Sequence, residues 1–239
     1  VGGVDVVLVC VAADDGVMPQ TREHLHICKL LDIRSAVVAI TKADLVDDEM
    51  LELAEADVRS TLEALGIEPS AVVRTAVTDG RGLPELRSAL GALAAATPPR
   101  GASRRAWLPL DRVFSVKGAG TVVTGTLTRG SLTLGAPVYV ATARGVRESA
   151  CRGLEVHGRS VAAAEAPCRV AVNLARLEVG DVARGDVLTL EPELPLTARL
   201  DARLTAVAGA EKALDDGSPV TVHVGTTRVG ARIVRIGAD

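Results

Sequence analysis

Two patterns of apolar and polar positions alternate over the first 97 residues. Short runs that are apolar throughout predict strands at 5–11, 36–40 and 71–75. Between and after them, apolar residues recur at helical spacing and predict helices at 21–31, 48–65 and 83–96. Wholly apolar strands that alternate with helices are typical of a parallel sheet covered on both faces. This part of the chain is therefore predicted to be α/β.

The pattern changes after residue 97. The stretch TPPRGASRR (97–105) combines proline, glycine and charge, as domain linkers do. From 108 to 192, short β-branched segments interrupted by glycines predict a small antiparallel β-barrel or sandwich. Alternation then returns in TARLDARLTAV, SPVTVHVGTT and ARIVRI. We predict four segments: 1–98 (α/β), 99–107 (linker), 108–192 (β-barrel) and 193–239 (strands that begin a second, truncated β-barrel).

Composition excludes several classes of protein. The apolar runs are far shorter than the roughly 20 residues that span a bilayer, and no signal peptide opens the chain, so we expect a cytoplasmic protein without membrane contacts. Four scattered cysteines without clustered histidines favour reduced thiols over disulfides or a metal site. The net charge of -3 and only three aromatic residues argue against a general single-strand nucleic-acid binder.

Two loops that follow predicted strands carry candidate binding chemistry. Ligands of open α/β sheets bind beyond the carboxyl ends of the strands. After the second strand, the carboxylate of Asp44 can accept from guanine N1–H and the exocyclic amine, and the stem of Lys42 can lie along the ring. Thr41 opens this loop. After the third strand come Thr75 and Ala76, where a backbone N–H near Ala76 can donate to guanine O6.

A simpler interpretation is that Lys42 and Asp44 are ordinary loop charges, with Asp44 or Asp47 capping the next helix. The usual guanine reader also begins with asparagine, so Thr41 forgoes one neutral hydrogen bond, worth about 0.5–1.5 kcal/mol. The order and spacing of the two loops after parallel strands favour guanine binding.

Longer motifs resemble the translational GTPases. GGVDVVLVCVAADDGVMPQTREHL (2–25) is similar to the stretch that follows their D-x-P-G-H element, and TKAD and TAVTDGRGLPEL (75–86) to their fourth and fifth guanine-nucleotide motifs. The resemblance implies that 1–98 is the C-terminal part of a GTP-binding domain. It also implies that the phosphate loop, the residues for Mg²⁺ and the catalytic histidine precede Val1. We therefore expect GTP or GDP with Mg²⁺ in the full-length parent, and no catalytic residue or GTP hydrolysis in this fragment.

The second half resembles one branch of that superfamily. LPLDRVFSVKGAGTVVTGTLTRGSLTLGAPV (108–138) is similar to the second domain of factors that carry aminoacyl-tRNA. Asp111-Arg112, RGLEVHGRSV (152–161), CRVAVNLA (168–175) and Thr41 resemble the selenocysteine-specific elongation factors. That family implies delivery of selenocysteinyl-tRNA to the ribosome at recoded UGA codons with GTP hydrolysis. It also implies recognition of an mRNA hairpin by a C-terminal extension, to which nothing in these residues corresponds.

Charge can separate selenocysteine from serine and cysteine. A selenol is a stronger acid than a thiol, whose ordinary pKa is about 8.5, so fixed cations would favour the selenolate. By the resemblance, Arg112 and Arg169 supply the cations and Asp111 orients them or holds the amino group, with His157 as a secondary candidate. We expect Arg112 and Arg169 to converge at one barrel mouth. The simpler alternative is that each forms an ordinary surface ion pair.

Other functions stay open on the sequence alone. They are a general aminoacyl-tRNA elongation factor of the Tu type, an initiation factor, and the GTPase subunit of a sulfate adenylyltransferase. Binding of an elongator tRNA regardless of its amino acid, binding of initiator tRNA, and copurification with a nucleotidylyltransferase would distinguish them. A dinucleotide-dependent oxidoreductase is disfavoured, because no G-x-G-x-x-G follows a predicted strand.

Overall fold

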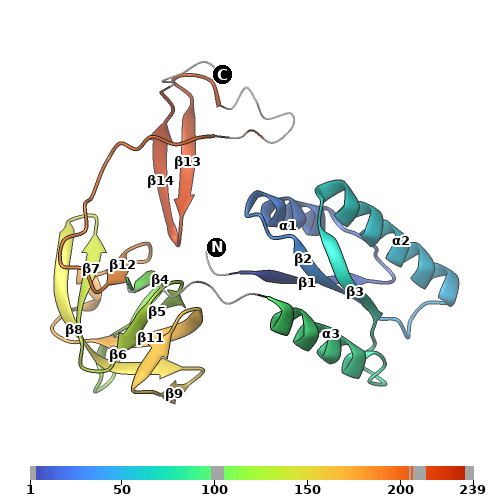
Figure 1. Cartoon of the computed structure of the whole chain (residues 1–239), viewed down its shortest axis with the longest axis horizontal. Coiled ribbons are helices and arrows are strands. Elements are labelled where there is room, and N and C mark those ends of the chain that lie inside the picture. The colour runs from blue at the N-terminus through green and yellow to red at the C-terminus, as the bar shows by residue number, and fades with distance from the viewer. Residues whose placement is uncertain (1–3, 98–104, 205, 207–213, 235–239) are drawn as a thin grey trace. The chain divides into compact units, whose positions relative to one another are not determined.

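The computed structural model describes residues 4–97, 105–204, 206 and 214–234. The chain divides into two compact units, an α/β unit at Val4–Pro99 and a β unit that contains Arg100–Asp239. Most of the predicted linker (99–107) lies outside the described residues, although strand β4 already begins at Trp107. Figure 1 shows the elements of each unit.

The α/β unit has three parallel strands in the order β1-β2-β3. Their bounds are Val6–Ala12 (β1), Ser35–Thr41 (β2) and Glu68–Arg74 (β3). The helices are α1 (Pro19–Leu30), α2 (Asp48–Leu65) and α3 (Leu83–Ala96). The predicted α/β class is confirmed, and the prediction placed α2 and α3 at these bounds.

Two boundaries differ from the prediction for local reasons. Helix α1 begins two residues early, at Pro19, because the fixed φ of proline suits the first helical position. Strand β3 begins at Glu68 rather than 71, since Glu68 and Pro69 still pair with β2 before the register shifts. Proline is tolerated there because β3 is an edge strand in the described sheet.

Helix α2 is fixed at both ends and along one face. Asp47 is its N-cap, and the Asp47 carboxylate accepts a hydrogen bond from the Met50 N–H at 2.9 Å. Gly66 ends the helix in the left-handed conformation, with φ 70°. The buried side chains of Val58 and Leu62 pack with the apolar residues of β1 and β2. The cap is therefore Asp47, which leaves Asp44 outside the helix.

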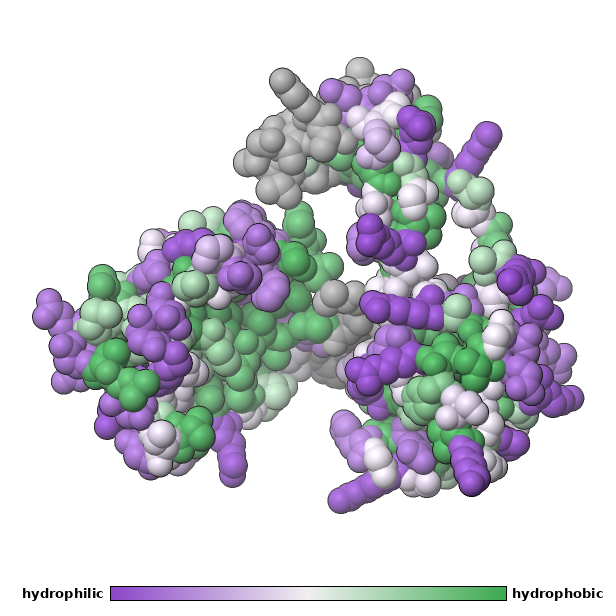
Figure 2. All heavy atoms as spheres, turned by 180° about the vertical axis from the view of Figure 1, so that it is seen from behind, coloured by the Kyte–Doolittle hydropathy of each residue, from purple (hydrophilic) through white to green (hydrophobic). Residues whose placement is uncertain are grey.

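Strand β1 is the other edge of the described sheet, and part of one face remains open. Val9 and Val11 are buried, whereas Leu8 is 41% exposed and Cys10 is also exposed. These residues alternate along the strand, so the exposed pair shares one face. Figure 2 shows apolar residues gathered on one side of the α/β unit.

The β unit contains a closed antiparallel barrel, which confirms the predicted architecture. Six strands follow one another around it in the order β11-β5-β4-β12-β7-β8, and the pairing of β11 with β8 closes the ring. Their bounds are β4 Trp107–Val116, β5 Gly120–Leu127, β7 Pro137–Thr142, β8 Gly145–Val156, β11 Cys168–Leu174 and β12 Val187–Thr189.

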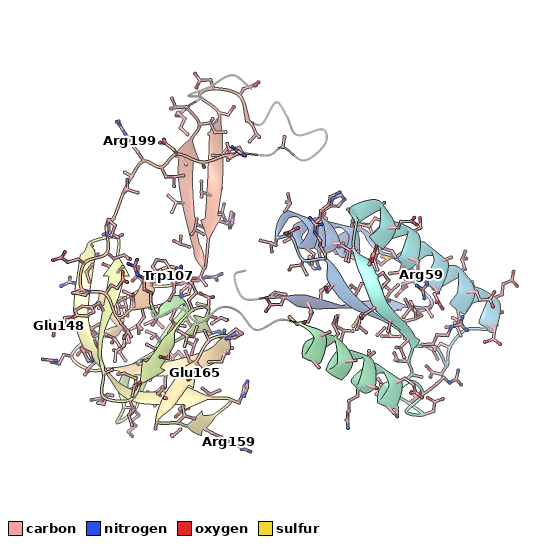
Figure 3. All side chains as sticks on the ribbon, in the orientation of Figure 1. Arg59, Trp107, Glu148, Arg159, Glu165 and Arg199 are labelled. Atoms are coloured by element: carbon pink, nitrogen blue, oxygen red, sulfur yellow. The ribbon has the colours of Figure 1, made fainter. Side chains whose placement is uncertain are left out.

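Smaller elements complete the barrel. Strand β6 (Ser131–Thr133) pairs with β10 (Ala163–Glu165), and β9 (Arg159–Ser160) pairs antiparallel with the end of β8. A 3-10 turn lies at Val179–Asp181. Leucine and valine side chains fill the interior. On Trp107, labelled in Figure 3, the Arg129 guanidinium stacks 5.1 Å from the ring centroid.

The last described residues form a hairpin of β13 (Pro219–Val224) and β14 (Thr227–Arg232). At its tip the Thr226 hydroxyl donates to the Leu110 carbonyl at 2.6 Å. The strand predicted from TARLDARLTAV is wrong for its described residues 197–204 and 206, which have no strand. Leu200 is 67% exposed there, so the alternation finds no sheet or core to pair with.

Across the described residues, no helix has the length and apolar character needed to cross a membrane.

Candidate functional site

The two loops predicted to read a base lie together at the carboxyl edge of the parallel sheet. Thr41 is the last residue of β2, and Thr75 follows the end of β3. The Thr75 N–H donates to the Ile40 carbonyl at 2.7 Å, and the Ala43 N–H donates to the Thr75 carbonyl at 3.1 Å. Adjacent parallel strands therefore bring the loops into direct contact, as the sequence order implies.

Asp44 is exposed but already oriented. Its Oδ2 accepts a hydrogen bond from the Thr78 hydroxyl at 2.7 Å, across the two loops. The Asp44 side chain is thus tied to the loop after β3, while its Oδ1 makes no hydrogen bond within the described residues. Thr78 was not predicted from the sequence, because only the fold shows which residue of the second loop faces Asp44.

A backbone N–H near Ala76 was expected to donate to guanine O6. The N–H of Ala76 itself is already used, because it donates to the Arg81 carbonyl at 3.0 Å. The next N–H, that of Val77, makes no hydrogen bond in the described part of the chain, and Val77 is 86% exposed. The turn closes at Gly82, with φ 69°, where an added Cβ would lie 1.9 Å from the Arg74 carbonyl oxygen.

Lys42 is held by Asp14, and more distantly approached by Asp15, in the loop that follows β1. Its Nζ lies 2.9 Å and 2.8 Å from the two carboxylate oxygens of Asp14, and 3.4 Å from Asp15. The hydrogen bond between them lowers the pKa of Asp14 and raises that of Lys42. Lys42 also has a positive φ of 58°. Neither aspartate was singled out in the sequence, although both follow the first strand of the sheet.

On the barrel, Asp111 and Arg169 form a bidentate ion pair. The Arg169 guanidinium donates to both Asp111 oxygens, at 3.1 Å from Nη2 to Oδ1 and through a shorter contact from Nη1 to Oδ2. The Thr124 hydroxyl donates to Oδ1 at 2.8 Å. Burial alone would raise the pKa of Asp111, but these hydrogen bonds and the charges of Arg169 and Arg112 hold it below its ordinary value.

A β-bulge explains how Asp111 reaches this position. In the pairing of β4 with β5, Leu110 lies opposite Gly125 and Arg112 opposite Thr124, which leaves Asp111 as the extra residue. Consecutive strand residues normally point to opposite faces. The extra residue lets the Asp111 carboxylate reach Thr124, the residue opposite Arg112.

Arg112 and His157 are the other two residues predicted for this site. Arg112 is exposed, and its charge acts on the Asp111 carboxyl. His157 is an exposed turn residue with φ 51° directly after Val156, which pairs with Val170, the neighbour of Arg169. Of the four predicted residues, Asp111 and Arg169 are joined by an ion pair, and Arg112 acts on Asp111 through its charge. A contact of His157 with the other three is not among the hydrogen bonds of the described chain.

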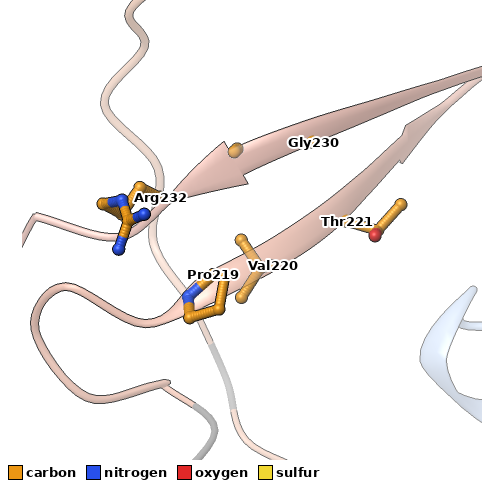
Figure 4. A pocket seen from close by; sticks show the side chains of 6 residues that line it. Pro219, Val220, Thr221, Gly230 and Arg232 are labelled. Atoms are coloured by element: carbon orange, nitrogen blue, oxygen red, sulfur yellow. The ribbon is translucent and has the colours of Figure 1, made fainter.

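A separate surface groove lies on the β13–β14 hairpin (Figure 4). Its lining has one charged side chain, Arg232, and none of the predicted site residues. This groove offers no cluster of catalytic or ligating groups, so it does not compete with the two candidate sites above.

Comparisons with known proteins bear on both units. Residues 2–99 match the family model described as the elongation factor Tu GTP binding domain. The selenocysteine-specific elongation factor of Desulfomicrobium baculatum is 39% identical over 237 residues, which are 99% of this chain and 37% of that protein. The corresponding factor of Escherichia coli K12 is 35% identical over 98% of this chain and 37% of its own length. The predicted resemblance to the selenocysteine-specific elongation factors is confirmed.

Solved structures of selenocysteine-specific factors agree in fold. A bacterial selenocysteine-specific elongation factor superposes with a TM-score of 0.82 at 26% identity, covering 98% of this chain and 39% of that one. The factor from Methanococcus maripaludis in complex with the GTP analogue GppNHp gives 0.79 at 26% identity, covering 95% of this chain and 50% of the other. This chain spans about 37% of the length of the curated selenocysteine-specific factors that it matches.

Proposed function

We propose that this chain is the part of a selenocysteine-specific elongation factor that reads the guanine base and holds the aminoacyl end of selenocysteinyl-tRNA. The supporting observation is the similarity to such factors, which extends over both units of the chain. The whole protein would act in the cytoplasm. It would bind GTP, deliver selenocysteinyl-tRNA to the ribosome at recoded UGA codons and hydrolyse GTP, with an mRNA hairpin as a further partner.

The donors and acceptors of the loops after β2 and β3 fit a guanine base. Thr78 holds the Asp44 carboxylate, which can accept from guanine N1–H and the exocyclic amine. The Val77 N–H can donate to O6, and the Lys42 stem can lie along the ring. Among the described residues, no three His, Cys, Asp or Glu side chains gather as metal ligands would, so we assign Mg²⁺ to none of them.

The barrel cluster fits an anionic side chain next to an amino group. Arg112 and Arg169 carry two positive charges against the single negative charge of Asp111, so one positive charge remains in excess. A selenolate would be attracted to that excess charge, whereas the hydroxyl of serine would not. In the proposed complex Asp111 keeps Arg169 in place and can also accept from the α-amino group.

The test is the affinity of the full-length protein, with GTP, for one tRNA charged with selenocysteine or with serine. We expect a strong preference for selenocysteine, which Arg112→Ala and Arg169→Ala abolish. Arg147→Ala is a matched control, because Arg147 is exposed on the same barrel but lies nine residues along β8 from Val156. Equal affinity for both tRNAs in the unaltered protein would contradict the proposal and favour a general aminoacyl-tRNA factor.

A second test addresses the base. Asp44→Asn should weaken GDP binding by at least roughly tenfold, because hydrogen bonds to a charged group are worth about 1.5–3 kcal/mol each. Asp48→Asn is the control, since Asp48 lies in the first turn of α2, outside the loop. Equilibrium titration with a fluorescent GDP measures both. Unchanged affinity in Asp44→Asn would remove Asp44 from the guanine site.

A further inference from the structure

Asp14 lies in the loop after β1, next to the loop after β2 that is proposed to read the base. Strands β1 and β2 are parallel neighbours, and Ala12 at the end of β1 lies opposite Thr41 at the end of β2. The pairing continues one step beyond the strands, because the Ala13 N–H donates to the Thr41 carbonyl at 2.9 Å. The residues after Ala13 and after Thr41 therefore start side by side.

The loop that carries Asp14 is itself closed. The Asp15 and Gly16 N–H groups both donate back to the Ala12 carbonyl, at 3.2 Å and 2.9 Å. The Val17 N–H then donates to the Asp57 carboxylate of α2 at 3.1 Å. This short loop is thus anchored at both ends to the body of the unit, and Asp14 has a defined position.

Lys42 uses that position. The Lys42 backbone has a positive φ of 58°, which is unusual for a residue with a side chain and costs of order 1 kcal/mol or more. The Lys42 ammonium donates to both oxygens of Asp14, so the long side chain is fixed at its backbone end and at its ammonium end. The Lys42 side chain as a whole stays 45% exposed, so a ligand can still reach it while its ammonium is held.

We propose that Asp14 is a positioning residue of the guanine site, which acts by holding the stem of Lys42 where the base will lie. The inference rests on the proposed guanine-binding role of Lys42. A free lysine side chain samples many rotamers and loses this freedom on binding, at a cost that prior ordering reduces. Asp14 supplies the ordering before the nucleotide arrives.

Asp15 provides an internal comparison. It is also acidic and adjacent in the chain, but its single contact with the Lys42 ammonium is 3.4 Å long. Asp14 makes two contacts under 3 Å to the same ammonium. Removal of Asp15 changes the local charge by the same amount, while the bidentate hold on Lys42 remains.

A double-mutant cycle on GDP affinity in the full-length protein tests the proposal. The variants are Asp14→Ala, Lys42→Met and their combination, with Asp15→Ala as control. Methionine keeps an apolar stem but loses the ammonium that Asp14 holds. We expect Asp14→Ala to weaken GDP binding by roughly threefold to tenfold, Asp15→Ala to change it less than about twofold, and Asp14→Ala to add nothing in the Lys42→Met background.

Each other outcome overturns the proposal. If Asp14→Ala leaves the affinity unchanged, or weakens it equally with and without Lys42, then Asp14 does not act through Lys42, and the guanine site itself stands. If the unaltered protein does not bind GDP, the proposed function fails and this inference fails with it. Thermal unfolding of each variant checks the fold, and Asp14→Asn replaces Asp14→Ala if the alanine variant is unfolded.

Discussion

Asp111 owes its contacts to one extra residue in a strand. The sequence identified Asp111, Arg112 and Arg169 only through a family resemblance, and no periodicity indicated the bulge that brings Asp111 to Thr124. Thr124 was missed for the same reason, since its role depends on a register that short-range patterns do not encode. Thr78, the partner of Asp44 in the second loop, was also missed, because the sequence does not show which residue of that loop faces Asp44.

The turn at Gly82 gives a prediction at this scale. Gly82→Ala should lower the free energy of unfolding by more than about 2 kcal/mol, because it adds a severe overlap with the Arg74 carbonyl to the strain of a positive φ. Gly80→Ala is the matched control. Gly80 also has a positive φ, of 80°, but an added Cβ meets nothing within 4 Å. Urea unfolding that ranks the two variants equally would contradict the overlap argument.

Individual elements were predicted well where apolar spacing and end signals agree. Helix α2 has the buried stripe, the Asp47 cap and the Gly66 stop, and its observed bounds are those predicted. The alternation at 197–204 and 206 did not give a strand, because a strand also needs a partner and these described residues have none. For 108–192 the strand pattern alone left a barrel or a sandwich open, because the pairing of β11 with β8 that closes the barrel is a long-range contact.

The cap of α2 can be tested directly. Asp47→Ala should reduce the free energy of unfolding by about 1 kcal/mol, since the Met50 N–H loses its acceptor. Asp48→Ala removes a charge from the same first turn without removing the cap, so its effect should be about 0.3–1 kcal/mol and should shrink in salt. A larger effect of Asp48→Ala than of Asp47→Ala in chemical unfolding would refute this assignment of the cap.

For the whole molecule, ionised carboxylates favour the folded state at neutral pH. Hydrogen bonds from Lys42 and Arg59 are the main cause of the lowered pKa values of Asp14 and Glu55. In Asp111, burial opposes the hydrogen bonds from Arg169 and Thr124, but its pKa is lowered overall. In the opposite sense, burial raises the pKa of Asp186.

These shifts predict acid destabilisation. A carboxyl with a lowered folded pKa stabilises the protein above its unfolded pKa and loses that contribution as pH falls through the folded value. The free energy of unfolding should therefore decrease below about pH 4. The raised pKa of Asp186 has the opposite effect on stability, but among the described residues three carboxyls have lowered pKa values and only this one is raised. Asp111→Asn should make the decrease shallower in urea unfolding from pH 7 to 3, and a flat profile in the unaltered protein would disprove the argument.

The exposed face of β1 carries a thiol, Cys10, whose rate of alkylation depends on whether that face is covered. Burial raises the pKa of the Cys28, Cys151 and Cys168 thiols and slows their alkylation, because only the thiolate reacts. Cys10 is exposed beside Leu8. Maleimide should therefore label Cys10 first, and a polypeptide that covers this face of β1 should slow that labelling.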